Sequence, residues 1–106
     1  MSLVRIVTTP HPDTTQRVEL DGVVYTLRIR WSERGSAWHM DMSDIDGEPI
    51  ISGLRLVTLY PLLARFRHLA VPAGEMLFFD RKDEGAQPTL EDMGERFRLY
   101  YLEASV

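Results

Sequence analysis

The chain has 106 residues, of which 44% are hydrophobic and 26% charged, and its formal net charge is −4. This balance predicts one ordinary globular domain over residues 1–106, with 1–14 as an extended arm or an edge strand. The sequence has no cysteine, which excludes disulfides, thiol catalysis and thiolate zinc sites. Its negative net charge argues against nucleic-acid binding, because proteins that bind nucleic acid gain most of their affinity by neutralising phosphates.

The first half of the chain predicts an antiparallel meander, because its side chains alternate between apolar and polar along each run. A strand is expected at Leu3–Thr8, and the alternating runs follow at Thr15–Leu20, Val23–Trp31, Ala37–Ser43 and Glu48–Ser52. Asp21-Gly22 separates the first two alternating runs and predicts a tight hairpin, since that turn requires positive φ. Further turns are expected at Ser32–Gly35 and Asp44–Gly47.

The second half of the chain predicts two more strands and little helix. The segment 61–69 has apolar residues at helical spacing after Pro61, so we expect a short helix or a structured loop there. Glu75–Asp80 predicts a strand that is apolar on both faces, Thr89–Asp92 a one-turn helix, and Arg96–Leu102 a final strand. The fold class is therefore mainly β, a small single-domain barrel or sandwich of about seven short antiparallel strands.

No residue pattern in the sequence has the spacing of a catalytic, metal or cofactor site. His11 lies beside Asp13 in a proline-broken loop, and His39 shares a strand face with Asp41, where we favour a solvated polar face over a metal site. The acidic start at Asp44 resembles a calcium loop, but the twelfth position holds arginine. The serines lack a nucleophile elbow and the glycines occur singly, so we expect no catalytic residue, no metal and no cofactor.

Aromatic and arginine side chains supply the candidate interface residues, because these types dominate the binding energy of interfaces. The candidates are Trp31, Trp38, Tyr60, Arg65, Phe66, Arg67 and His68. The two tryptophans flank the Ser32–Ala37 turn, where packing in the core or at its rim is the stronger interpretation and anchoring of a partner the weaker one. The 60–69 segment is either a docking surface or a local lid, and the sequence favours neither.

The order and spacing of these features resemble a known family. The matching segments are Val18–Gly22, Tyr25–Arg34, Trp38–Asp44 with Asp46-Gly47, Ile51–Leu56, Tyr60–Leu63, Pro72–Gly74 and Arg98–Leu102. They resemble the cyanophage-type baseplate plug family of contractile-tailed bacteriophages, a related component of which is called a ripcord. The resemblance covers nearly the entire chain, from about residue 14 to residue 103. The family has no catalytic residues to transfer to this chain.

The resemblance implies a structural subunit of the virion tail baseplate, made in the bacterial host cytoplasm. Such a subunit docks between tail tube, hub or spike and neighbouring wedge proteins, in multiple copies around the tail axis, without nucleic acid or membrane. The alternative is a small phage or bacterial inhibitor that binds a host protein. A third class, a small β-barrel enzyme or ligand carrier, ranks lowest because bulky inward side chains would fill the interior. The opening residues lack a signal-peptide pattern, and no apolar window is long enough to cross a bilayer.

Overall fold

The computed structural model describes residues 3–58, 61–82 and 88–104. Within these ranges the elements, in chain order, are β1 Leu3–Ile6, β2 Asp13–Leu20, β3 Val23–Ser32, β4 Ala37–Asp44, β5 Pro49–Arg55, the 3₁₀ turn η1 Ala64–Phe66, β6 Glu75–Asp80 and β7 Phe97–Leu102. The predicted mainly β class with about seven strands is confirmed. None of the helical residues described here forms a segment long and apolar enough to cross a bilayer.

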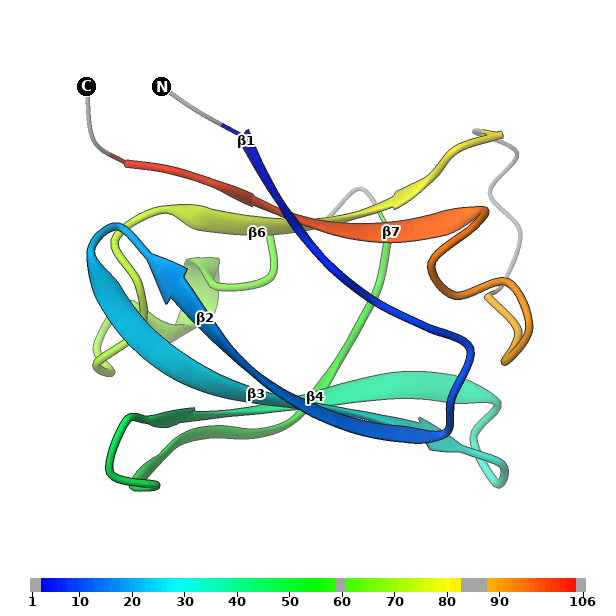
Figure 1. The fold of residues 1–106 in the computed structure, drawn as a ribbon, viewed down its shortest axis with the longest axis horizontal. Coiled ribbons are helices and arrows are strands. Elements are labelled where there is room, and N and C mark those ends of the chain that lie inside the picture. Colours follow the sequence, from blue (N-terminus) through cyan, green and yellow to red (C-terminus); the bar gives the residue numbers. More distant parts are fainter. Residues whose placement is uncertain (1–2, 59–60, 83–87, 105–106) are drawn as a thin grey trace.

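The strands form two antiparallel sheets that face each other as two layers (Figure 1). One sheet has the order β1-β7-β6, and the other has the order β2-β3-β4-β5. Of the two predicted architectures, the sandwich fits and the closed barrel does not. The chain passes from the larger sheet to the smaller through residues 56–58, where Thr58 forms a single parallel bridge with Phe78 of β6.

The β2–β3 hairpin forms where the sequence predicts it. Asp21 and Gly22 have φ values of 51° and 81°, the positive values that a tight turn between twisted strands requires. The pairing places Val18 opposite Tyr25 and Leu20 opposite Val23. This register fixes which side chains of β3 enter the space between the sheets, because a slip of one residue would turn all of them outward.

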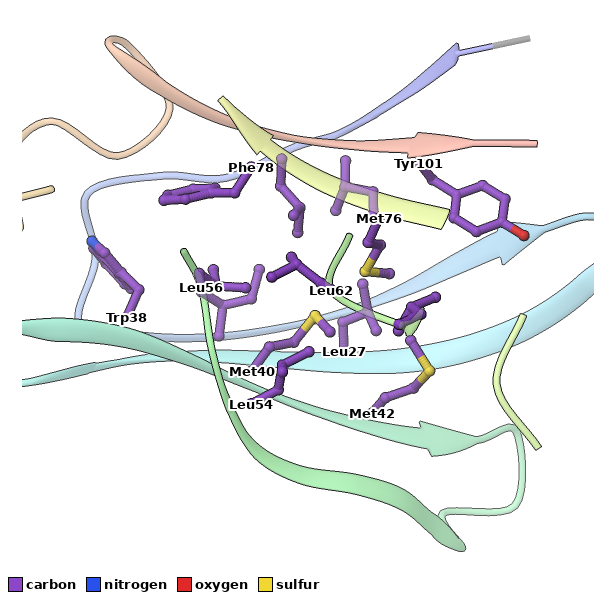
Figure 2. Packing of buried hydrophobic residues seen from close by; sticks show 14 of the residues in the cluster. Leu27, Trp38, Met40, Met42, Leu54, Leu56, Leu62, Met76, Phe78 and Tyr101 are labelled. Carbon is purple, nitrogen blue, oxygen red and sulfur yellow. The ribbon is translucent and has the colours of Figure 1, made fainter. Parts of the chain in front are cut away.

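The core lies between the two sheets and is filled by large side chains (Figure 2). The larger sheet contributes Tyr25, Leu27 and Ile29 from β3, and Trp38, Met40 and Met42 from β4. The smaller sheet contributes Met76, Phe78, Phe97, Leu99 and Tyr101 to the same core. Figure 2 shows Met76, Phe78 and Tyr101 on the layer opposite Leu27, Met40 and Met42. The expected alternation is therefore confirmed along the middle of the Val23–Trp31 run and along the Ala37–Ser43 run, whereas at the ends of the first run Val23 is 51% exposed and Trp31 is half-buried. Aromatic, thioether and aliphatic side chains occupy the interior.

One predicted detail differs from the structure, and one strand extends beyond its alternating run. The expected one-turn helix at Thr89–Asp92 is a turn, because the Asp92 carbonyl accepts hydrogen bonds from the backbone N–H groups of Glu95, Arg96 and Phe97, which turn the chain into β7. The strand of the Glu48–Ser52 run continues to Arg55 in β5, within the meander that the sequence predicts to extend to about residue 58. It does so through Gly53, whose φ of 69° suits an irregular pairing with β4.

Asp41 of β4 fixes this irregularity in β5. One of its carboxylate oxygens, Oδ1, accepts hydrogen bonds from the Gly53 N–H at 2.7 Å and from Arg30 Nη2 at 3.0 Å. Partial burial raises the pKa of Asp41, but the Gly53 N–H and Arg30 outweigh burial and hold the pKa below the ordinary value of 3.8. The ionised form of this carboxyl is therefore the one that the fold favours.

Because the pKa of Asp41 is lowered in the folded state, we expect this carboxylate to contribute less to the free energy of unfolding in acid. A carboxyl whose folded pKa lies below its unfolded value of 3.8 stabilises the fold above that pH, and the contribution disappears as the pH falls through the folded pKa. The difference in free energy of unfolding between the wild type and Asp41→Asn should therefore be constant well above pH 3.8 and shrink as the pH falls through that value and below it. Urea denaturation at stepped pH measures it, and a pH-independent difference would contradict the assignment.

Candidate functional site

The titratable side chains singled out in the sequence lie apart from one another in the described part of the chain. Among them, no three histidine or acidic side chains lie close enough together to hold a metal ion. His11 is exposed and its Nδ1 lies 3.0 Å from Thr9 Oγ1. His39 pairs in register with Arg30, and Asp41 with Arg28, as the strand pattern predicts for a polar outer face.

Two hollows in the described surface open onto solvent. One, of about 330 Å³, lies on the outer face of the larger sheet and includes Arg28 and Asp41 in its lining. The other, of about 390 Å³, is lined by Arg81, Lys82, Glu95 and Arg96 where β6 ends and β7 begins. Arg28, Asp41 and Arg96 each form an ion pair within the chain, so these charged groups already have partners.

The 60–69 segment, a candidate docking surface, is only partly described. Tyr60 lies outside the described residues, and so does the side chain of Arg65, although its backbone belongs to η1. Phe66 is half-buried and packs against the core, whereas His68 is exposed. Of the described candidates here, Arg67 and His68 are exposed and Phe66 is partly exposed.

Arg67 holds the segment before β6 in place. Its guanidinium donates hydrogen bonds to the carbonyls of Pro72, at 2.8 Å, and Gly74, and to Glu75 Oε2 at 3.1 Å. Glu75 Oε1 in turn accepts the Leu63 N–H at 2.6 Å. Because arginine presents several donors in a fixed planar fork, one side chain ties η1 to the start of β6.

Replacing Arg67 should destabilise the isolated chain. Arg67→Met keeps most of the aliphatic stem and removes the donors, so we expect the free energy of unfolding to fall by about 1–3 kcal/mol, the cost of leaving partly buried acceptors unpaired. His68→Ala, one residue away on an exposed position, should change it by less than about 0.5 kcal/mol. Chemical denaturation of the two purified variants measures both changes. Equal free energies of unfolding for Arg67→Met and His68→Ala would contradict the role given to the hydrogen bonds of Arg67.

The two candidate tryptophans form an edge-to-face pair with ring centroids 5.4 Å apart. Trp38 is fully buried, and its Nε1 donates to the Thr89 carbonyl oxygen at 3.3 Å. Trp31 is half-buried, with its Nε1 donating to Glu33 Oε1 at 3.1 Å. Trp38 therefore packs in the core of the folded chain, and only Trp31 of the pair has solvent-exposed side-chain surface that a partner can contact.

A second buried contact was not foreseen from the sequence. The Tyr101 hydroxyl of β7 donates to an Asp21 carboxylate oxygen in the β2–β3 turn and accepts the Gly74 N–H at 2.6 Å. Burial raises the pKa of Tyr101, and the hydrogen bond to Asp21 raises it further, so the hydroxyl remains a protonated donor. Tyr101 and Asp21 are 80 residues apart, and no local pattern links them.

By its fold the chain is a small antiparallel β-sandwich with a filled core. A family model described as cyanophage baseplate Pam3 plug gp18 matches residues 1–104, and the chain belongs to this family of phage baseplate plug proteins. The resemblance noted from the sequence is thereby confirmed. No individual curated protein matches the chain significantly. Family membership assigns the chain a structural role in the tail baseplate of the virion, among other baseplate proteins.

Proposed function

We propose that the chain is a plug- or ripcord-like docking subunit of a contractile tail baseplate, bound between the tail tube, the hub or spike and neighbouring wedge proteins. Several copies would surround the tail axis, after synthesis in the host cytoplasm. The family match over residues 1–104 is the observation that carries this proposal.

The sandwich is suited to such a role for a physical reason. Its core side chains fill the space between the sheets, and long-range hydrogen bonds such as that between Tyr101 and Asp21 tie the two layers together. A rigid subunit loses little conformational entropy on docking, so modest contacts suffice. In a ring, several copies bound to one symmetric partner add their affinities through high effective concentration. We therefore propose a non-enzymatic role, with Trp31, Phe66 and His68 among the contacting residues.

Co-sedimentation tests this proposal. Tails are purified by density gradient from the phage or prophage that encodes the chain, and quantitative mass spectrometry compares the chain with the tube protein. We expect the chain in the tail fraction at a constant copy number per tail. A chain that stays in the unassembled fraction and binds a host protein would contradict the proposal and support the inhibitor alternative.

A further inference from the structure

The outer face of the β1-β7-β6 sheet is apolar. Counting alternately from the buried positions, the outward side chains include Leu3 of β1, Val7 just after it, Leu77 and Phe79 of β6, and Tyr100 and Leu102 of β7. Leu3 and Val7 are 54% and 62% exposed, and the other four are partly exposed. Phe79 and Tyr100 form an edge-to-face pair with centroids 5.6 Å apart. We refer to these six residues as the outer apolar face.

The outer face of the other sheet is polar, as is usual for an antiparallel sheet with one side in water. Its outward positions on β2 are Asp13, Thr15, Arg17 and Glu19, all exposed. Ion pairs join Arg28 to Asp13 at 2.6 Å and Arg30 to Asp41 at 3.0 Å on this side. The two sheets therefore differ in what they present to their surroundings, and the apolar one has the character of a contact surface.

Two arginines lie within the outer apolar face. Arg5 of β1 stands opposite Tyr100, and Arg98 of β7 stands opposite Phe79. Both donate to the Gly94 carbonyl, Arg5 at 3.1 Å and Arg98 at 3.4 Å, and neither forms an ion pair with any carboxylate among the described residues. At the border of the face, Glu75 is already paired with Arg67 at 3.1 Å.

The charge of the face indicates what covers it. Two copies meeting through this face would bury four guanidinium groups, while Glu75, the carboxylate on the same side of β6, is already paired with Arg67. Charged groups left without a partner in a desolvated contact are costly. A different protein that presents carboxylates among apolar side chains would pair with both arginines and bury the aromatic surface. Arginine next to aromatic side chains is the composition of energetically dominant interface regions.

We propose that the outer apolar face, with Arg5 and Arg98, docks onto an acidic and apolar surface of another baseplate protein. This inference rests on the proposed function and specifies one docking surface of that subunit. The partner's carboxylates would form charge-assisted hydrogen bonds with the two guanidinium groups, and its apolar side chains would pack on Leu77, Phe79 and Tyr100.

Charge reversal tests the role of the arginines. The host cell expresses the wild type and a tagged variant together, and the ratio of the two in purified tails is measured against their ratio in the cell extract. We expect Arg5→Glu/Arg98→Glu to be depleted from tails about tenfold or more, because each reversal places like charges together. Arg17→Glu is the matched control, since Arg17 is an exposed arginine on an edge strand of the polar sheet, and it should be incorporated like the wild type. Circular dichroism and thermal melting confirm that the variants fold.

A photo-crosslinker identifies the occupant and does not depend on the charge variants. With p-benzoylphenylalanine at Tyr100, illumination of purified tails should link the chain to a different tail protein, whereas the same group at Thr26, on the outer face of the other sheet, should give a different pattern or none. Links from position 100 to another copy of this chain, normal incorporation of the double variant, or equal depletion of Arg17→Glu would overturn the inference while leaving the proposed function intact. Absence of the wild-type chain from tails would remove the proposed function, and the inference with it.

Discussion

Gly74→Ala is expected to lower the free energy of unfolding by about 3 kcal/mol or more. A β-carbon at this position would overlap the Leu102 carbonyl oxygen and lie 2.6 Å from the Tyr101 hydroxyl oxygen. Neither neighbour can move freely, because Leu102 belongs to β7 and the Tyr101 hydroxyl is hydrogen-bonded to both Asp21 and the Gly74 N–H. The substitution therefore forces apart the segment before β6 and the end of β7.

The control for this prediction is Gly35→Ala, in the β3–β4 turn. A β-carbon there would meet Ser32 Oγ at 3.6 Å, an ordinary contact, so the change should stay within about 0.5 kcal/mol. Urea denaturation monitored by tryptophan fluorescence measures both variants. If Gly74→Ala proved as mild as Gly35→Ala, the close approach between Gly74 and β7 would not exist as described.

Trp38→Ala is expected to lower the free energy of unfolding by about 3–5 kcal/mol, in the range of large aromatic deletions from well-packed cores. The indole is fully buried between the sheets, and its loss leaves a cavity beside Trp31 as well as an unpaired Thr89 carbonyl. Trp31→Ala should cost distinctly less, because Trp31 is only half-buried and its N–H is paired with an exposed glutamate.

The tryptophan comparison also separates packing from docking. Trp31→Ala should retain a stable fold and be the informative variant for incorporation into tails, whereas Trp38→Ala should fail through instability. Denaturation and the co-sedimentation assay, applied to both variants, give the two readouts. Equal losses of stability in the two variants would contradict the packing described for the pair.

Local patterns were sufficient for the strands but not for the contacts between them. The Val23–Trp31 run alternates over its whole length, and Asp21-Gly22 supplies a turn that few dipeptides can form. These two patterns are sufficient to set the register in which β2 pairs with β3. The bulge at Gly53 was not foreseen, because a lone glycine after two isoleucines and a serine is equally compatible with a strand end.

Local sequence patterns were likewise insufficient for the candidate interface residues, whose contacts depend on the tertiary fold. Arg67 lies between Phe66 and His68, among residue types that favour a docking surface, but its hydrogen-bonded carbonyls are brought near by the chain reversal before β6, which no local pattern shows. The two-sided apolar character of Glu75–Asp80 was visible in the sequence and reads most simply as a doubly buried strand. In the structure Met76 and Phe78 enter the core, while Leu77 and Phe79 remain at the surface. Only the sheet order reveals that β7 adds Tyr100 and Arg98 beside them.

Electron cryo-microscopy of the intact tail tests the central claim most directly. The account predicts density for this two-layer β-sandwich inside the baseplate, repeated around the tail axis, with the β1-β7-β6 face turned towards a different, acidic tail protein. A map in which every baseplate density is accounted for by other proteins, and none fits this sandwich, would contradict it.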